Sequence, residues 1–165
     1  MRIKIENCLS LPIKGEVPKA ERVFLSMDYI YTTRMQVRDY ECDIQGIVNN
    51  ANYLHYTEHT RHMFLRSLGI SFADMHEKGE DVVVARMTLQ YKVPLRCDDE
   101  FISCLNIERD GLRYIFNQDI YRASDMKLSH RAKVEIVCLI NGRLAKSPTC
   151  DKLFDGGFAA IHLEA

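Results

Sequence analysis

A carboxylate and the start of a predicted helix lie close together in the segment D43-I-Q-G-I-V-N-N-A-N-Y53. Asp43 supplies the carboxylate, Gly46 allows a flexible turn, and a helix is predicted to begin near Ala51. The first amides of a helix have no acceptor within it, so they can polarise a carbonyl oxygen. A carboxylate beside such amides suits attack on an acyl group, either directly or through an activated water. The same residues could equally form an ordinary turn, because Asp and Gly are common in loops.

Two charged residues of the predicted helix, Glu58 and Arg61, lie about one turn apart and can form an ion pair. Arg61 falls on the apolar face of the helix, where an unpaired charge is costly. We therefore expect a structural ion pair between them. The alternative is that Glu58 takes part in the reaction by holding the attacking water.

The run H55-Y-T-E-H59 matches the H-x-x-E-H pattern of inverted zinc peptidases. Together with His62 these side chains form one polar stripe that could hold a metal. The stripe lies opposite the apolar face, however, and only strands are predicted after the helix. We therefore expect no metal and keep the zinc peptidase as a remote alternative. Cys42 is a weaker candidate nucleophile still, because no base for it is evident nearby.

Hydrophobic periodicity predicts the strands and the helix around these residues. Strict alternation from Tyr31 to Val37 predicts a half-buried strand. A helix follows over about 51–68 and ends at Gly69, a residue that tolerates positive φ. Four antiparallel strands are predicted after the helix, with turn signals at Asp110-Gly111, Ser124-Asp125 and Asn141-Gly142.

The apolar face of this helix spans roughly 200° of arc, which is wide for a helix at the surface. Such a helix must be wrapped by the sheet. The predicted fold class is therefore α+β, with a five-stranded antiparallel sheet curled around one long helix.

Length and composition limit the classes of protein. The 165 residues suffice for one domain, and 22 basic against 23 acidic residues argue against a nucleic-acid binder. No apolar run approaches the ~20 residues that cross a bilayer. The six cysteines include no C-x-x-C pair, and we interpret them as reduced thiols of a cytoplasmic protein. Residues 1–28 lack periodicity and are predicted to be an extension outside the domain, which covers 29–165.

The run from Asp43 to Arg61, D-I-Q-G-I-V-N-N-A-N-Y-L-H-Y-T-E-H-T-R, resembles the signature of the 4-hydroxybenzoyl-CoA thioesterase family, including its acyl-CoA thioesterase branch. The later segment Q90-Y-K-V-P-L-R-C-D-D-E-F101 resembles a strand-to-strand link of the same family. The resemblance implies the hotdog fold, assembly into homodimers or homotetramers, and hydrolysis of an acyl-CoA without any cofactor except the coenzyme A of the substrate. By position, Asp43 would be the nucleophile or general base, and the amide of Asn50 would polarise the thioester carbonyl. Gly46 would let the loop approach the ligand.

Substrate contacts are predicted from the same two segments. Val48, Asn49 and Tyr53 flank the predicted helix start, and Lys92 and Arg96 flank Pro94, where they could bind the phosphates of coenzyme A. The V-N-N step at residues 48–50 resembles acyl carrier protein thioesterases, so that protein is an alternative carrier of the acyl group. A hotdog protein that binds an acyl thioester without hydrolysing it is a second alternative.

Overall fold

The computed structural model describes residues 29–152 and residue 154. The predicted extension, residues 1–28, lies outside the described residues, as does most of the chain after residue 152. The elements in chain order are β1 (Tyr31–Gln36), η1 (Asp39–Glu41), α2 (Asn50–Ser67), α3 (Phe72–Glu77), β2 (Glu80–Tyr91), β3 (Glu100–Asp110), β4 (Arg113–Arg122), β5 (Leu128–Ile140), β6 (Arg143–Ala145) and α4 (Pro148–Asp151).

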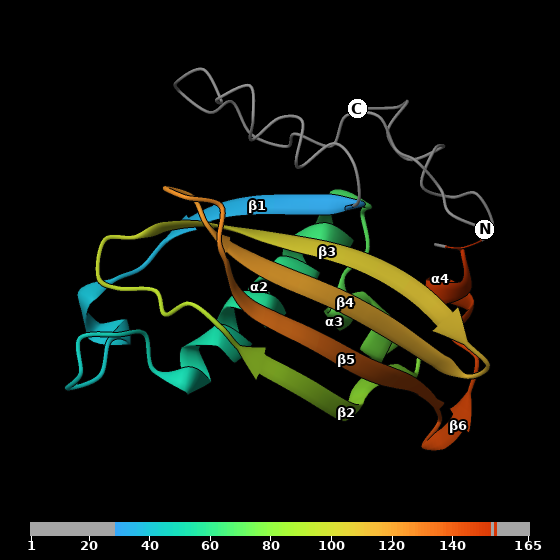
Figure 1. Ribbon diagram of the computed structural model, residues 1–165. Coiled ribbons are helices and arrows are strands. Elements are labelled where there is room, and N and C mark those ends of the chain that lie inside the picture. The colour runs from blue at the N-terminus through green and yellow to red at the C-terminus, as the bar shows by residue number, and fades with distance from the viewer. Residues whose placement is uncertain (1–28, 153, 155–165) are drawn as a thin grey trace.

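The strands form one antiparallel sheet in the order β1-β3-β4-β5-β2, and the short β6 pairs with β5. Figure 1 shows the sheet curving over α2, with β1 and β2 at opposite edges. The predicted helix in a curled antiparallel sheet is therefore confirmed. The sheet has one strand more than the predicted five, because the chain reverses at Asn141 and Gly142, both with positive φ, and pairs again with β5.

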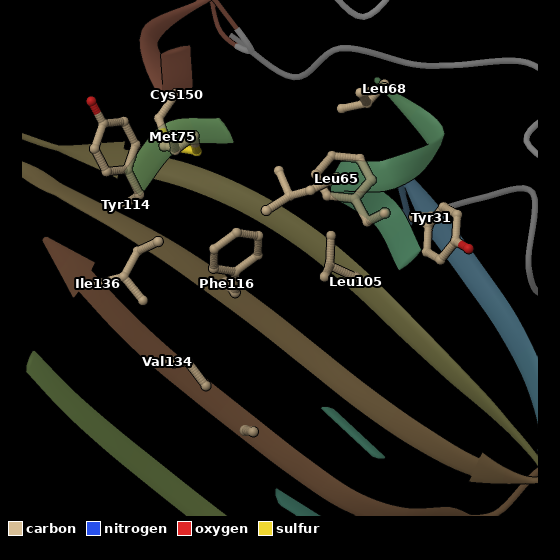
Figure 2. Packing of buried hydrophobic residues seen from close by; sticks show 12 residues of the cluster. Tyr31, Leu65, Leu68, Met75, Leu105, Tyr114, Phe116, Val134, Ile136 and Cys150 are labelled. Carbon is tan, nitrogen blue, oxygen red and sulfur yellow. The ribbon is translucent and has the colours of Figure 1, made fainter. Parts of the chain in front are cut away.

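The helix α2 begins and ends where its sequence predicts. The side chain of Asn49 caps its first turn by accepting from the amide of Ala51, and Gly69 follows its end with a φ of 70°. The main core lies between α2 and the sheet, where Leu65 of the helix and Leu68, which follows it, pack with Phe116 and Val134 of the strands. Figure 2 shows these side chains in the space between the two elements. Burial of this apolar face holds the helix inside the curl.

Two short α-helices were missed by the periodicity. The six-residue α3 is defined by its cap, in which Ser71 accepts from the amide of Asp74, rather than by an apolar repeat. The four-residue α4 is capped by Ser147, whose hydroxyl also donates to the buried carboxylate of Glu80 at 2.6 Å. Segments this short show less than two helical turns, so they carry no readable period.

A layer of polar side chains lies within the helix–sheet interface. Thr60 of α2 donates to the hydroxyl of Ser103 at 2.7 Å. Arg61 donates to the side-chain oxygen of Gln118 at 2.8 Å, and Gln118 in turn donates to the carbonyl of Thr57. Burial lowers the pKa of Arg61. These bonds fix the rotation of the helix against β3 and β4.

The predicted ion pair between Glu58 and Arg61 is wrong. Glu58 is exposed, whereas Arg61 is buried and its hydrogen bond goes to Gln118 on the sheet. The two residues are close in sequence, but the guanidinium points inward and the carboxylate points into solvent. No ion pair joins them in the part of the chain that the structure describes.

His130 is the most deeply buried titratable side chain near the helix start. It is fully buried, its ring lies 5.0 Å from the rings of both Tyr53 and Tyr91, and neither ring nitrogen has a hydrogen-bond partner among the described residues. Burial lowers its pKa to about 4, with the nearby charge of Asp119 acting in the opposite direction. The neutral imidazole therefore serves as a packing group.

This burial predicts a loss of stability in mild acid. Because the pKa of His130 is lower in the folded chain than the unfolded value near 6.5, its contribution is full above that value and falls as the pH drops toward about 4. We expect wild type to lose about 2 kcal/mol more than His130→Phe between pH 7 and pH 5, measured by urea unfolding. Equal pH dependence of the two proteins would contradict the buried neutral imidazole.

Candidate active site

The loop before α2 is closed by its own backbone. The amide of Asp43 donates to the carbonyl of Ile47 and the amide of Gly46 donates to the carbonyl of Asp43, each at 2.9 Å. One carboxylate oxygen of Asp43, Oδ1, accepts from the amide of Gln45 at 2.8 Å. The other oxygen, Oδ2, has no hydrogen-bond partner among the described residues. The loop therefore fixes the carboxylate while leaving one oxygen available for chemistry.

The segment between β2 and β3 holds this loop in place. The amide of Val48 donates to the carbonyl of Leu95 at 2.9 Å, and Arg96 donates to the carbonyl of Gly46 at 3.4 Å. Gly46 has a φ of 69°, a conformation that favours glycine. The two segments singled out in the sequence are thus brought together, with Arg96 beside the Asp43 loop.

At the start of α2, the amide of Asn50 differs from its neighbours in its hydrogen bonding. The amide of Asn49 donates to the carbonyl of Glu41 at 2.9 Å, that of Ala51 to the side chain of Asn49 at 3.0 Å, and that of Asn52 to the carbonyl of Asn49. The amide of Asn50 has no acceptor among the described residues. A free amide at the positive end of a helix is the kind of donor that binds a developing oxyanion.

Glu41 was not singled out in the sequence, although it organises this site. Its buried carboxylate accepts from the hydroxyl of Tyr56 at 2.7 Å and from the amide of Arg38 at 2.8 Å. Its carbonyl accepts from Asn49 and from the side chain of Asn52. Burial, and then the hydrogen bond to Glu41, raises the pKa of Tyr56 far above its usual range, so the phenol remains a donor. Glu41 lies between two other acids, Asp39 and Asp43, so nothing in the sequence around it indicates that it is buried.

The remaining predicted contacts divide by exposure. The side chains of Val48 and Tyr53 are buried in the same small core, and the hydroxyl of Tyr53 accepts from the amide of Leu95 at 3.1 Å. Lys92 is exposed just after β2. Glu58 is exposed on α2, and no contact among the described residues joins it to Asp43. Arg96 contacts the Asp43 loop at Gly46, while Asn49 and Asn50 form the start of α2 that follows this loop.

The competing interpretations receive no geometric support. His55, Glu58, His59 and His62 lie on the exposed side of α2, and in the described ranges no three of His, Cys, Asp and Glu come together in a metal-binding arrangement. Burial, and then the charge of Asp43, raises the pKa of Cys42. A raised pKa makes the thiolate scarcer, which is the opposite of what a cysteine nucleophile requires.

Most of the chain matches a known protein family. The model of the thioesterase-like superfamily matches residues 37–153. The chain belongs to this superfamily. Over 116 residues it is 34% identical to the chloroplastic acyl-acyl carrier protein thioesterase ATL3 of Arabidopsis thaliana, covering 70% of this chain and 61% of that one. It is 30% identical over 112 residues to YneP of Bacillus subtilis, provisionally named an acyl-CoA thioesterase, covering 67% and 80%.

The fold prediction is confirmed by a solved structure. Slr0204, a 1,4-dihydroxy-2-naphthoyl-CoA thioesterase from Synechocystis, superimposes with a TM-score of 0.71 at 20% identity, covering 78% of this chain and 95% of that one. The hotdog architecture is therefore shared with thioesterases. Nothing in the described helices is long and apolar enough to cross a membrane.

The pairing of Glu41 with Tyr56 is expected to stabilise the helix start. Tyr56→Phe leaves a buried carboxylate short of one donor, so we expect the free energy of unfolding to fall by about 1–3 kcal/mol. Tyr40→Phe, which makes the same change on an exposed ring, is the control and should be neutral. Urea unfolding of both variants checks the prediction, and equal effects would show that Glu41 does not depend on Tyr56.

Proposed function

We propose that the protein hydrolyses an acyl-CoA thioester to the carboxylic acid and free coenzyme A, with Asp43 as the reacting carboxylate. The observation that carries the proposal is that one segment holds both a carboxylate with an available oxygen and, seven residues on, a helix-start amide with no acceptor among the described residues. Membership of the thioesterase-like superfamily supports thioester hydrolysis. The proposed reaction uses only the carboxylate and water.

Two courses of reaction fit these groups. In the first, Asp43 attacks the thioester carbonyl, the oxyanion is bound by the amide of Asn50, the thiolate leaves, and water hydrolyses the resulting mixed anhydride. In the second, Asp43 takes a proton from water, the hydroxide attacks, and the proton passes to the departing thiolate. Either course consumes one water and yields one acid and one thiol. Arg96, and Lys92 near it in sequence, would bind the phosphates of coenzyme A. A role of Glu58 in holding the water remains a prediction.

The direct test compares wild type with Asp43→Asn on short, long and aromatic acyl-CoAs, with released thiol as the measurement. We expect wild type to hydrolyse one acyl class and Asp43→Asn to lose about 10²–10⁴-fold in kcat. Asp39→Asn, a neighbouring acid whose carboxylate accepts from the amide of Tyr40, is the control and should retain activity.

The outcomes separate the enzyme from a binding protein. A variant that binds acyl-CoA as tightly as wild type, yet no longer hydrolyses it, supports the catalytic role of Asp43. If wild type binds acyl-CoA without releasing thiol, the protein is a non-catalytic hotdog module. If Asp43→Asn keeps full activity, the assignment of the carboxylate is wrong.

Acyl carrier protein is the second candidate for the carrier of the acyl group. The observation that favours it is the 34% identity to ATL3, although this chain spans only 61% of that relative. The same acyl group presented on coenzyme A and on acyl carrier protein distinguishes the two. A higher kcat/KM on the protein carrier would replace coenzyme A in the proposal.

Assembly into a homodimer, or a pair of dimers, is part of the same proposal, as is a cytoplasmic location. Support for the dimer comes from β2, a 12-residue edge strand that pairs only with β5 among the described strands. Four of its apolar side chains, Val83, Val84, Met87 and Tyr91, are 38–48% exposed. A long apolar edge invites pairing with another strand, and a second copy offers the same strand by symmetry.

This assembly can be broken at β2. Val84→Lys places a charge on the proposed contact, so we expect a monomer in sedimentation equilibrium where wild type is a dimer or larger, and a loss of hydrolysis with it. Leu144→Lys is the control, because Leu144 is 54% exposed on β6. A dimer that persists in Val84→Lys would remove β2 from the interface.

A further inference from the structure

Tyr91, the last residue of β2, contacts the start of α2 directly. Its hydroxyl donates to the main-chain carbonyl of Asn50, with an oxygen–oxygen distance of 3.3 Å. This hydrogen bond joins the edge strand to the residue whose amide lies free beside the Asp43 loop. The strand and the helix start are 41 residues apart in the chain, so local sequence cannot set their distance.

The peptide between Asn50 and Ala51 is held at both ends. Tyr91 donates to its carbonyl, and the side chain of Asn49 accepts from its amide at 3.0 Å. The preceding peptide, which carries the free amide of Asn50, is joined to it through a single Cα. A peptide plane fixed on one side limits the directions that the neighbouring amide can take, because only two backbone dihedrals separate them.

The ring of Tyr91 is itself held in place. It lies 5.0 Å from the ring of His130 and 5.6 Å from that of Tyr53, in tilted and edge-on arrangements respectively. Tyr53 accepts from the amide of Leu95, the residue whose carbonyl accepts from Val48 in the Asp43 loop. The three rings therefore connect the helix start to the segment that holds the loop.

We propose that Tyr91 is a positioning residue, which aims the amide of Asn50 at the thioester oxygen through its hydrogen bond to the Asn50 carbonyl. The inference rests on the proposed function, because the amide of Asn50 acts in the proposed hydrolysis of a thioester. A donor aligned before the reaction stabilises the developing oxyanion without reorganisation, so its loss of alignment costs rate rather than binding. Tyr91 does not react and need not touch the substrate.

The kinetic test removes only the hydroxyl. We expect Tyr91→Phe to lower kcat about tenfold with KM within about twofold of wild type, on whichever acyl thioester wild type hydrolyses. Tyr121→Phe makes the same change on β4, where the hydroxyl is hydrogen-bonded to that of Tyr29, away from the helix start. This control should keep the wild-type kcat.

A second readout needs no activity. Asn50-Ala51 is the single Asn-Ala step in the sequence, so protein with ¹³C-carbonyl asparagine and ¹⁵N alanine gives one cross-peak from this peptide. Loss of the donor should move the Asn50 carbonyl resonance upfield in Tyr91→Phe and leave it in place in Tyr121→Phe. Thermal unfolding of each variant confirms that it is folded.

The outcomes are distinct. A lower kcat together with the carbonyl shift supports the proposal. An unchanged kcat, a rise in KM alone, an equal loss of kcat in Tyr121→Phe, or an unmoved carbonyl resonance would each overturn it, and the rise in KM would make Tyr91 a substrate contact instead. If wild type hydrolyses no thioester, the proposed function fails first. The carbonyl resonance then still decides whether Tyr91 fixes the helix start.

Discussion

The buried carboxylate and carbonyl of Glu41 connect the loop of Asp43 to the helix that follows it. Five groups donate to this one residue: the amide and the guanidinium of Arg38 before it, and one group each from Asn49, Asn52 and Tyr56 after it. A carboxylate excluded from water is tolerated only with such donors. Two of the donors belong to α2 itself: Tyr56 binds the carboxylate and Asn52 binds the carbonyl. A shift of the helix along its axis would therefore break both hydrogen bonds. The free amide of Asn50 and the closed turn at Asp43 therefore keep a fixed relation.

The burial of α2 against the sheet is a second constraint on the position of this helix. Its apolar face and the polar bonds of Thr60 and Arg61 fix the helix against β3 and β4, at its middle and far end. Glu41 and Tyr91 fix its first turn from the loop and from the edge strand. The helix is thus held at several levels by elements far apart in the chain. A site built on such a helix start is less mobile than one built on a loop alone.

The sequence predicted these features to different extents, for physical reasons. Periodicity found α2 and the long strands because burial on one face repeats along them. It could not find α3 or α4, whose definition lies in the caps of Ser71 and Ser147 rather than in a repeat. Spacing on the helix suggested that Arg61 meets Glu58, whereas the partner is Gln118, 57 residues later. Partners across the sheet depend on register, which short-range pattern does not contain.

The site residues show the same division. Asp43, Gly46 and Asn50 lie in one continuous segment, so their motif was readable from the sequence. Among them, Gly46 donates to the carbonyl of Asp43, and Asn50 begins α2. The residues that hold this segment, Glu41 and Tyr91, have no motif of their own. Their positions follow from the fold, since β2 is at the edge of the sheet and yet ends against the first turn of α2. β2 is an open edge strand that also contacts the start of α2. Pairing of two copies along β2 would therefore act on the geometry of the helix start. A second copy pairing along β2 would cover the ring of Tyr91, which is 46% exposed in the single chain. In that arrangement the dimer contact and the alignment of the oxyanion donor depend on the same strand.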